Sequence, residues 1–536
     1  MKKKDEKIIE RLTQEWGKTK TTYSSSYLVQ KYFAYRAEND VVFGINERAV
    51  NDLDFKDYFA FVDRTTSAIG QQYLYAELRA LNQNADYLKN LESSIQHYSK
   101  DETLRYTVQK ELTNLADDKD YYFPDLVYGQ LPTKIKYIGL VKLLQVSILL
   151  CLFFIIYVPQ FSLLLMGTLT LSMLIHYWYK NRIGNFVVAF GRLGQLAKFS
   201  RILLEYSNKT ATEKEEKLSE IKKLDKLTSK VSFLKTNNLG NSELTDLLWL
   251  LIEIFKMFTL VEVVTFHELV KKIEEEQTTI ESLYRFIGAI DMALSIASLR
   301  SGLSYYAVPN FTTDNKEFKV QQIYHPLVEN CVANDLHLEE KSLLLTGSNM
   351  SGKSTFVKAL NLNLITSQVL NTSFSKNYTA PFFSVATAIK MGDDINEQKS
   401  YFLDEVMTVG ELIHHSKESQ QQYLFTIDEL FKGTNTIERV SAAKAILEFL
   451  NKSNHIILVS THDIELTLLL KEGYKMHYFQ ESIENEILSF DYKLKQGALQ
   501  KRNAINVLEL MDYPSEIITE AKALAVRFEQ EKTGNN

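Results

Sequence analysis

The residues with the clearest chemical pattern lie between 343 and 360, where the sequence reads LLLTGSNMSGKSTFVKAL. Residues 347–354 fit the pattern G-x-x-x-x-G-K-[ST], with an apolar run before them and a helical pattern after them. Such a loop lets backbone N–H groups and a helix N-terminus surround phosphate groups, while its lysine faces the β- and γ-phosphates. We therefore expect a nucleotide to be bound by Gly347, Ser348, Asn349, Met350, Ser351, Gly352, Lys353, Ser354 and Thr355.

Two further apolar runs end in residues that suit phosphate hydrolysis. YLFTIDEL ends near Asp428, which would bind Mg²⁺ together with the Ser354 hydroxyl, and Glu429, which would polarise the attacking water. ILVSTHD places His462 where a histidine can sense the γ-phosphate. An acidic pair after an apolar run is common, and a lone histidine is more often structural. The order of the three motifs nevertheless favours an ATPase, with Lys353, Glu429 and His462 as catalytic residues and ATP and Mg²⁺ as cofactors.

The three motifs lie in a region where short apolar runs alternate with helical patterns. KSLLLTG, QYLFTIDEL and HIILVSTHD are apolar runs of strand length, and this alternation is typical of a parallel α/β domain. The rest of the chain is poor in Gly and Pro (20 and 7 residues) and rich in helical patterns. The predicted fold is mainly α-helical, with an α/β P-loop ATPase domain of the ABC type at the C-terminus.

An apolar stretch with a single charge, Lys142, covers residues 138–179. Its two halves, Ile138–Tyr157 and Phe161–Trp178, each approach the roughly 20 residues that cross a bilayer. A buried helical hairpin in a soluble core is the alternative, but such helices usually keep a polar stripe. Lysine and arginine flank both sides of the stretch, which predicts cytoplasmic flanks. We expect a two-helix hairpin in the cell membrane, with the ATPase domain and both termini in the cytoplasm.

Composition limits the other classes of function. A chain of 536 residues holds several domains, and its net charge of −6 gives no overall basic footprint for nucleic acid. The lysine-rich stretch at 209–235 is interleaved with glutamates, as in a solvated helix face or loop. Cys151 and Cys331 lie too far apart in sequence to form a metal motif, which favours a reducing compartment. The N-terminus lacks the apolar core of a signal peptide.

Several of these motifs resemble the MutS family of mismatch-repair ATPases. TGSNMSGKST is similar to the phosphate loop of that family, DELFKGTNTIER to its acidic strand end and Gly-Thr turn, and STHDIEL to its switch-histidine segment. HPLVE resembles the entry to the ATPase domain, and SYFLDE resembles the signature that begins with a serine, here Ser400. The segment from Tyr492 resembles the C-terminal dimerisation helices, and VDRTTSAIGQQYLYAELRAL, at 62–81, resembles the start of the helical core.

The resemblance implies a homodimer with shared nucleotide sites. Ser400 of one chain would reach the γ-phosphate held by Lys353 of the other, so that ATP closes the dimer and hydrolysis opens it. It also implies DNA as a partner, gripped by levers built from the helical core.

The departures from the family pattern are equally specific. Lys399 stands before Ser400 where glycine is usual, and Glu438-Arg439 replaces an acidic–glycine pair. The resemblance begins near residue 45, so the mismatch-recognition domain is expected to be missing and mismatch specificity is in doubt. The chain thus resembles a membrane-tethered branch of the family.

The predicted organisation has five parts. They are a helical segment at 1–44, the first part of the helical core at 45–130, the membrane hairpin at 131–183, the second part of the core or lever at 184–315, and the ATPase domain with C-terminal dimerisation helices at 316–536. The predicted function is a membrane-anchored, dimeric, DNA-binding ATPase related to mismatch repair. The alternative is a membrane ATPase that acts as a switch on a protein or lipid partner without binding DNA.

Overall fold

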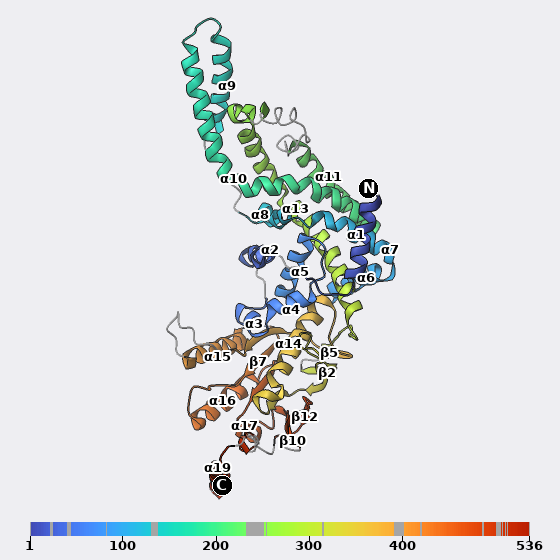
Figure 1. Ribbon diagram of the computed structural model, residues 1–536, viewed down its shortest axis with the longest axis vertical. Coiled ribbons are helices and arrows are strands. Elements are labelled where there is room, and N and C mark those ends of the chain that lie inside the picture. The colour runs from blue at the N-terminus through green and yellow to red at the C-terminus, as the bar shows by residue number, and fades with distance from the viewer. Residues whose placement is uncertain are drawn as a thin grey trace. The chain divides into compact units, whose positions relative to one another are not determined.

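The computed structural model describes residues 2–21, 25–39, 44–81, 83–129, 138–231, 251–252, 254–313, 316–390, 401–418, 421–484, 487–499, 505, 508–509, 511 and 513–534. The chain divides into two compact units. The first, called here the helical unit, comprises residues 1–42, 63–77 and 90–302. The second, called the sheet unit, comprises residues 43–62, 78–89 and 303–536. The prediction of a mainly helical chain is confirmed (Figure 1), whereas the five predicted domains stay a prediction.

The N-terminal half of the chain is built from helices. They are α1 (Lys2–Glu15), α2 (Ser26–Asn39), α3 (Glu47–Asp52), α4 (Phe55–Val62), α5 (Ala68–Ala80), α6 (Ala85–Lys100), α7 (Glu102–Leu112), η1 (Thr113–Leu115), η2 (Asp118–Tyr122), α8 (Phe123–Val127), α9 (Ile138–Phe154), α10 (Phe161–Glu205), α11 (Ala211–Val231) and α13 (Val261–Gly302).

Helix α13 forms the core of the helical unit. Buried apolar side chains recur along it every three to four residues, including Ile280, Leu283 and Ile287, which is the spacing of one helix face. A buried carboxylate on the same helix, Asp291, accepts hydrogen bonds from the backbone N–H groups of Thr66 and Ser67 at 2.8 and 2.7 Å. Helix α13 therefore holds the start of α5 by hydrogen bonding as well as by apolar packing.

Helices α9 and α10 contain the apolar stretch that the sequence assigns to the membrane. Figure 1 shows α9 and the first part of α10 side by side as a hairpin. Among the residues that the structure describes, two segments are long and apolar enough to cross a membrane by length and composition alone, Phe161–Tyr179 and Val263–Gly302, while Ile138–Phe154 is a shorter apolar helix. Only 11% of the first segment is buried, against 83% of the second. Helix α10 continues to Glu205, so the predicted domain boundary at 183/184 falls within a helix.

The sheet unit contains a six-stranded sheet. Its strands, in spatial order, are β12 (Lys495–Gln496), β9 (Tyr474–Tyr478), β4 (Ser342–Thr346), β8 (Ile456–Thr461), β7 (Tyr423–Asp428) and β6 (Ser384–Ala388). All neighbouring pairs from β9 to β6 are parallel, and β12 is antiparallel to β9. The carboxyl ends of parallel strands meet at one edge, where ligands bind in open α/β sheets.

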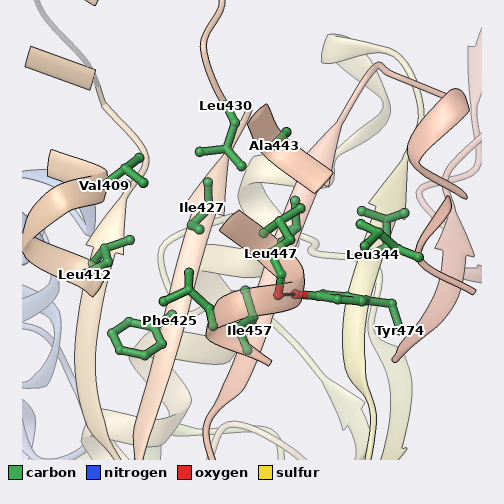
Figure 2. Packing of buried hydrophobic residues seen from close by; sticks show 14 of the residues in the cluster. Leu344, Val409, Leu412, Phe425, Ile427, Leu430, Ala443, Leu447, Ile457 and Tyr474 are labelled. Atoms are coloured by element: carbon green, nitrogen blue, oxygen red, sulfur yellow. Dashed lines mark hydrogen bonds between the residues drawn. The ribbon is translucent and has the colours of Figure 1, made fainter. Parts of the chain in front are cut away.

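Helices cover both faces of this sheet. Alternate residues of β7 and β8, such as Phe425 and Ile457, pack with Leu412 and Leu447 from α15 (Tyr401–Glu418) and α16 (Thr436–Leu450), as Figure 2 shows. The cluster also includes α17 (Glu465–Leu469). The opposite face receives α14 (Lys353–Leu370), where the Asn361 side chain donates to the Thr426 hydroxyl at 2.8 Å. Burial on both faces explains the nearly continuous apolar runs of these strands.

The sheet unit contains a second sheet, a hairpin and a C-terminal helix. A four-stranded sheet has the order β1 (Asn310–Phe311), β5 (Asn377–Ala380), β2 (Glu317–Ile323) and β3 (Asn334–Glu339). A hairpin pairs β10 (Glu481–Glu484) with β11 (Ile487–Phe490), and the last described helix is α19 (Ser515–Gly534).

Helix α3, although early in the chain, belongs to the sheet unit. Buried Asp52 accepts hydrogen bonds from the Thr387 hydroxyl at 2.6 Å and from the backbone N–H groups of Ile389 and Lys390 at 3.0 and 2.8 Å. It thereby fixes the chain just beyond β6.

Candidate nucleotide-binding site

The phosphate loop connects β4 to α14 at the carboxyl edge of the sheet. Gly347 and Gly352 have φ values of 143° and 101°, which L-residues rarely adopt. A Cβ atom on Gly347 would also lie 2.6 Å from the carbonyl oxygen of Phe479. Between the two glycines the chain forms the short turn η4 (Asn349–Ser351), and α14 begins at Lys353. Glycine is therefore required at 347 for both the backbone angle and the close approach.

Lys353 is the buried cation of the loop. Its side chain is 1% exposed, and its Nζ donates to the carbonyl oxygens of Gly347 and Ser348 at 2.7 and 2.9 Å. Burial lowers the pKa of Lys353 to about 8, although the negative charges of Asp428 and Glu429 favour the charged form. In the structure Nζ contacts two neutral carbonyl oxygens, so an anion bound in the loop would place a negative charge next to the ammonium group.

Asp428 and Ser354 form the part of the site suited to a metal ion. The Ser354 hydroxyl donates to Asp428 Oδ2 at 2.6 Å, and the Ser460 hydroxyl at the end of β8 donates to Oδ1. Within the described residues no group of three or more His, Cys, Asp or Glu could hold a metal. The geometry suits Mg²⁺, which commonly takes one or two protein oxygens and completes its shell with phosphate oxygens and water.

Glu429 follows Asp428 directly and lies between two nitrogen donors. Its Oε1 is 2.7 Å from His462 Nε2, and its Oε2 is 2.8 Å from Lys432 Nζ. Burial opposes ionisation of this carboxyl, but the hydrogen bonds from His462 and Lys432 outweigh it and lower the pKa to about 2. Glu429 is thus ionised at neutral pH, and both of its carboxylate oxygens are held by nitrogen donors.

The backbone around Glu429 is held in an uncommon conformation. Glu429 and Phe431 both have φ values of 58°, in the left-handed region. The Glu429 backbone N–H donates to the Ser460 carbonyl at 2.8 Å, and the N–H of Lys432 donates to the buried Glu405 carboxylate at 3.2 Å. Contacts from β8 and α15 therefore stabilise the turn that carries Glu429 and Lys432.

A cavity of about 490 Å³ adjoins the phosphate loop. Its lining includes His325, Cys331, Met350, Thr355 and Tyr492. The volume lies within the usual range for small-molecule sites, and the lining mixes apolar with a few polar groups. Burial lowers the pKa of His325 to about 4, so its imidazole is neutral at physiological pH and can accept a hydrogen bond.

The predicted site residues are thus placed as follows. Lys353, Ser354, Asp428, Glu429 and His462 meet at the carboxyl edge of the sheet. The remaining residues of the loop connect β4 to α14, with the Met350 side chain 70% exposed and the Ser351 hydroxyl donating to the Ser348 carbonyl. Ser400, predicted to serve the second chain of a dimer, lies outside the described residues.

Four residues of the site were missed by sequence reasoning. Ser460 binds Asp428, Lys432 pairs with Glu429, Glu405 holds the turn, and Glu481 accepts from the Ser348 hydroxyl at 3.0 Å. Lys432, Glu405 and Ser460 lie within the segments DELFKGTNTIER, SYFLDE and ILVSTHD, whose other residues were assigned roles, whereas Glu481 lies outside all of the quoted motifs.

Comparison with known proteins finds similarity to MutS proteins. Residues 343–529 match the family model described as MutS domain V. The DNA mismatch repair protein MutS of Geobacillus sp. (strain WCH70) is 31% identical over 281 residues, which are 50% of this chain and 32% of that protein. The MutS of Listeria welshimeri is 31% identical over 283 residues, 50% of this chain and 32% of that protein. Human MutS protein homolog 4 is 30% identical over 281 residues, 48% of this chain and 29% of that protein.

The similarity is confined to part of each protein. The chain spans about a third of the length of the curated MutS proteins that it matches, and the family model covers its C-terminal region. Within that region lie the phosphate loop, the Asp428–Glu429 strand end and the His462 segment. Residues 343–529 thus match MutS domain V, and about half of the chain is similar to proteins of the MutS family.

Proposed function

We propose that the chain is a Mg²⁺-dependent ATPase whose nucleotide site lies at the carboxyl edge of the six-stranded sheet. The observation that carries this proposal is the placement of Glu429. Its ionised carboxylate is held by His462 and Lys432 and directly follows Asp428, which pairs with Ser354 at the end of a glycine loop that contains buried Lys353.

The residues would divide the work of phosphoryl transfer to water. The loop N–H groups and Lys353 bind the phosphates, and Ser354 and Asp428 hold Mg²⁺, which supplies neutralising charge when bound. Glu429 accepts a hydrogen bond from the attacking water and orients it, while His462 fixes the Glu429 carboxylate at 2.7 Å. The cavity beside Gly352 and Thr355 offers room for the nucleoside.

We further propose that the chain works as a homodimer with shared sites. The support is the family resemblance of the SYFLDE segment, whose Ser400 would serve the partner's nucleotide. Mixing Ser400→Ala with Lys353→Ala chains tests this, because each mixed dimer would hold one site without either lesion. A shared site gives partial recovery of turnover on mixing, and a self-contained site gives none.

A membrane anchor in residues 138–179 is the third part of the proposal. The support is the exposure of the hairpin, since large apolar side chains such as Leu149, Leu163 and Met166 are 67%, 76% and 69% exposed. Exposed apolar surface of this extent marks a contact with membrane or protein. Helices of 17 and 19 residues rise about 25 and 28 Å, close to the hydrocarbon thickness of a bilayer. The flanking cations put both termini on the cytoplasmic side.

DNA is proposed as the partner on which the ATPase acts, because the two bacterial relatives described above are named as DNA mismatch repair proteins. The second candidate is an ATPase switch on a protein or lipid partner, favoured by the exposed hairpin and by the net charge of −6.

One assay of the purified chain in detergent tests the ATPase and separates the two partners. Phosphate release is measured with Mg²⁺ or EDTA, and with no DNA, duplex, mismatched or branched DNA, at several salt concentrations. A DNA-binding ATPase changes its turnover with DNA and loses the effect steeply as salt rises. The second candidate hydrolyses ATP without responding to DNA, and absence of Mg²⁺-dependent turnover under all conditions contradicts both.

A further inference from the structure

An ion pair between Arg439 and Asp463 lies next to His462, and the sequence motifs did not predict it. Arg439, on the first turn of α16, donates from Nε to Asp463 Oδ2 at 2.9 Å and from Nη2 to Oδ1 at 2.7 Å. Arg439 is also the residue that departs from the usual acidic–glycine pair after the Gly-Thr turn. The bidentate fork therefore joins α16 to the segment that follows β8.

The fork fixes the residue directly after His462. Asp463 is also held by its backbone, because its N–H donates to the Thr461 hydroxyl at 3.0 Å and its carbonyl accepts from the Leu466 N–H at 3.2 Å. Its side chain is 13% exposed and that of Arg439 is 22% exposed, so the pair is poorly screened by solvent. His462 thus lies between the end of β8 and an anchored aspartate.

A rigid backbone at this point would help to keep the His462 side chain in place. Its side chain is 41% exposed, yet its Nε2 lies 2.7 Å from the Glu429 carboxylate. A half-exposed side chain loses rotamer freedom when it is held in one position, and this cost falls when the backbone beneath it is rigid. The hydrogen bonds of the Arg439 guanidinium go to Asp463, Thr434 and Thr436. The bond to Asp463 raises the pKa of Arg439, and the charge of Glu429 contributes to the same shift. Arg439→Lys keeps the positive charge and therefore separates loss of the fork from loss of the charge.

We propose that Arg439 is a positioning residue, whose fork to Asp463 keeps the His462 imidazole against Glu429 during turnover. This inference rests on the proposed ATPase function for its kinetic readout. Arginine suits the role because its planar guanidinium binds a carboxylate at two points, whereas lysine offers a single mobile charge. The turn beside it is independently fixed by Asn435, whose side chain accepts from the Glu438 N–H at 3.0 Å.

The kinetic experiment uses the full chain in detergent with the variants Arg439→Gln and Arg439→Lys. Both should lower kcat roughly ten-fold, the equivalent of one charge-assisted contact, with KM for ATP changed less than about two-fold. Lys444→Gln is the matched control, because it breaks an exposed pair with Glu448 on the same helix and should leave kcat unchanged. In a His462→Asn background, Arg439→Gln should add no further loss.

A second readout needs no ATP turnover. Diethyl pyrocarbonate modifies accessible imidazoles, and mass spectrometry gives the rate at each histidine. Arg439→Gln and Arg439→Lys should both raise the rate at His462 several-fold, while buried His455 serves as an internal reference that stays unchanged. A parent chain without ATPase activity would defeat the proposed function, and the modification rate would still decide the role of Arg439. Equal rates at His462 in the parent and Arg439→Gln chains overturn the proposal, as does an equal kcat loss in the His462→Asn background.

Discussion

The phosphate-loop edge of the sheet and the α9–α10 hairpin depart from ordinary burial in opposite directions. At the sheet edge, charged groups are buried and paired, with Lys353 1% exposed and Glu429 enclosed by His462 and Lys432. In the hairpin, apolar groups are exposed, and only 11% of Phe161–Tyr179 is buried. Soluble chains usually place charge outside and large apolar residues inside. Each departure therefore points to a ligand that supplies the missing environment, a polyanion in one region and an apolar phase in the other.

Removal of the buried cation at the sheet edge should have a large effect on nucleotide binding. Lys353→Ala should weaken ATP binding by roughly a hundred-fold or more, since charge-assisted contacts of about 1.5–3 kcal/mol each are lost. Binding of a fluorescent ATP analogue measures the change. Lys341→Ala, at an exposed lysine just before β4, is the control and should bind like the parent. If Lys353→Ala binds ATP with the affinity of the parent, Lys353 does not contact the phosphates of ATP.

The two regions also differ in how far the sequence alone could describe them. Spacing and apolar runs located the loop at 347–354 and the strand ends at Asp428 and Thr461, because these signals are local in the chain. Partners such as Ser460 and Glu405 come from other elements, and only the folded sheet brings them to Asp428 and to the turn after Glu429.

Hydropathy likewise could not separate two helices of similar composition. Val263–Gly302 passes the same length and composition test as Phe161–Tyr179, yet 83% of it is buried within the helical unit. Burial depends on neighbours that a sequence window does not contain.

An arginine placed in each of these two helices tests whether the first lies in a membrane and the second in the protein core. Leu171→Arg, at a half-exposed position in the middle of Phe161–Tyr179, should cost about 2.5–3.5 kcal/mol of membrane insertion. We expect a smaller carbonate-resistant membrane fraction and normal ATP turnover in detergent.

The paired substitution is Ile287→Arg, at a fully buried position in α13. It should instead unfold or aggregate the helical unit in every medium, because it buries an unpaired charge. If Leu171→Arg leaves the membrane fraction unchanged, the hairpin is not an anchor.

The lowered pKa of Lys353 gives a smaller, pH-dependent effect. Without ATP the lysine titrates at about 8, and bound phosphates would raise this pKa because they favour the charged form. Above pH 8 the ATP-free chain holds fewer protons than its complex, so binding takes up a proton and weakens by up to roughly ten-fold per pH unit. Calorimetry at pH 8.5 in two buffers of different ionisation enthalpy measures this uptake, and heats that do not depend on the buffer would contradict it.

Asp52 is a buried carboxylate outside the nucleotide site, and its replacement should change only the stability of the fold. Asp52→Asn should lower the free energy of unfolding by about 1–3 kcal/mol, since the amide cannot accept all three hydrogen bonds from Thr387, Ile389 and Lys390. Thermal unfolding followed by circular dichroism measures the loss. Asp57→Asn, at an exposed position on α4, should leave the free energy of unfolding unchanged. Equal stability of the two variants would show that the hydrogen bonds of Asp52 do not stabilise the fold.

The most direct test of the central claim is the ATP turnover of Glu429→Gln beside its ATP affinity. Glutamine keeps the size of the side chain that lies between His462 and Lys432, but it lacks the negative charge that would orient the attacking water. We predict Mg²⁺-dependent ATP binding close to that of the parent and a turnover lower by roughly a hundred- to ten-thousand-fold, the usual contribution of a positioned base. Hydrolysis by Glu429→Gln at the parental rate would show that the acidic edge of the sheet does not activate water.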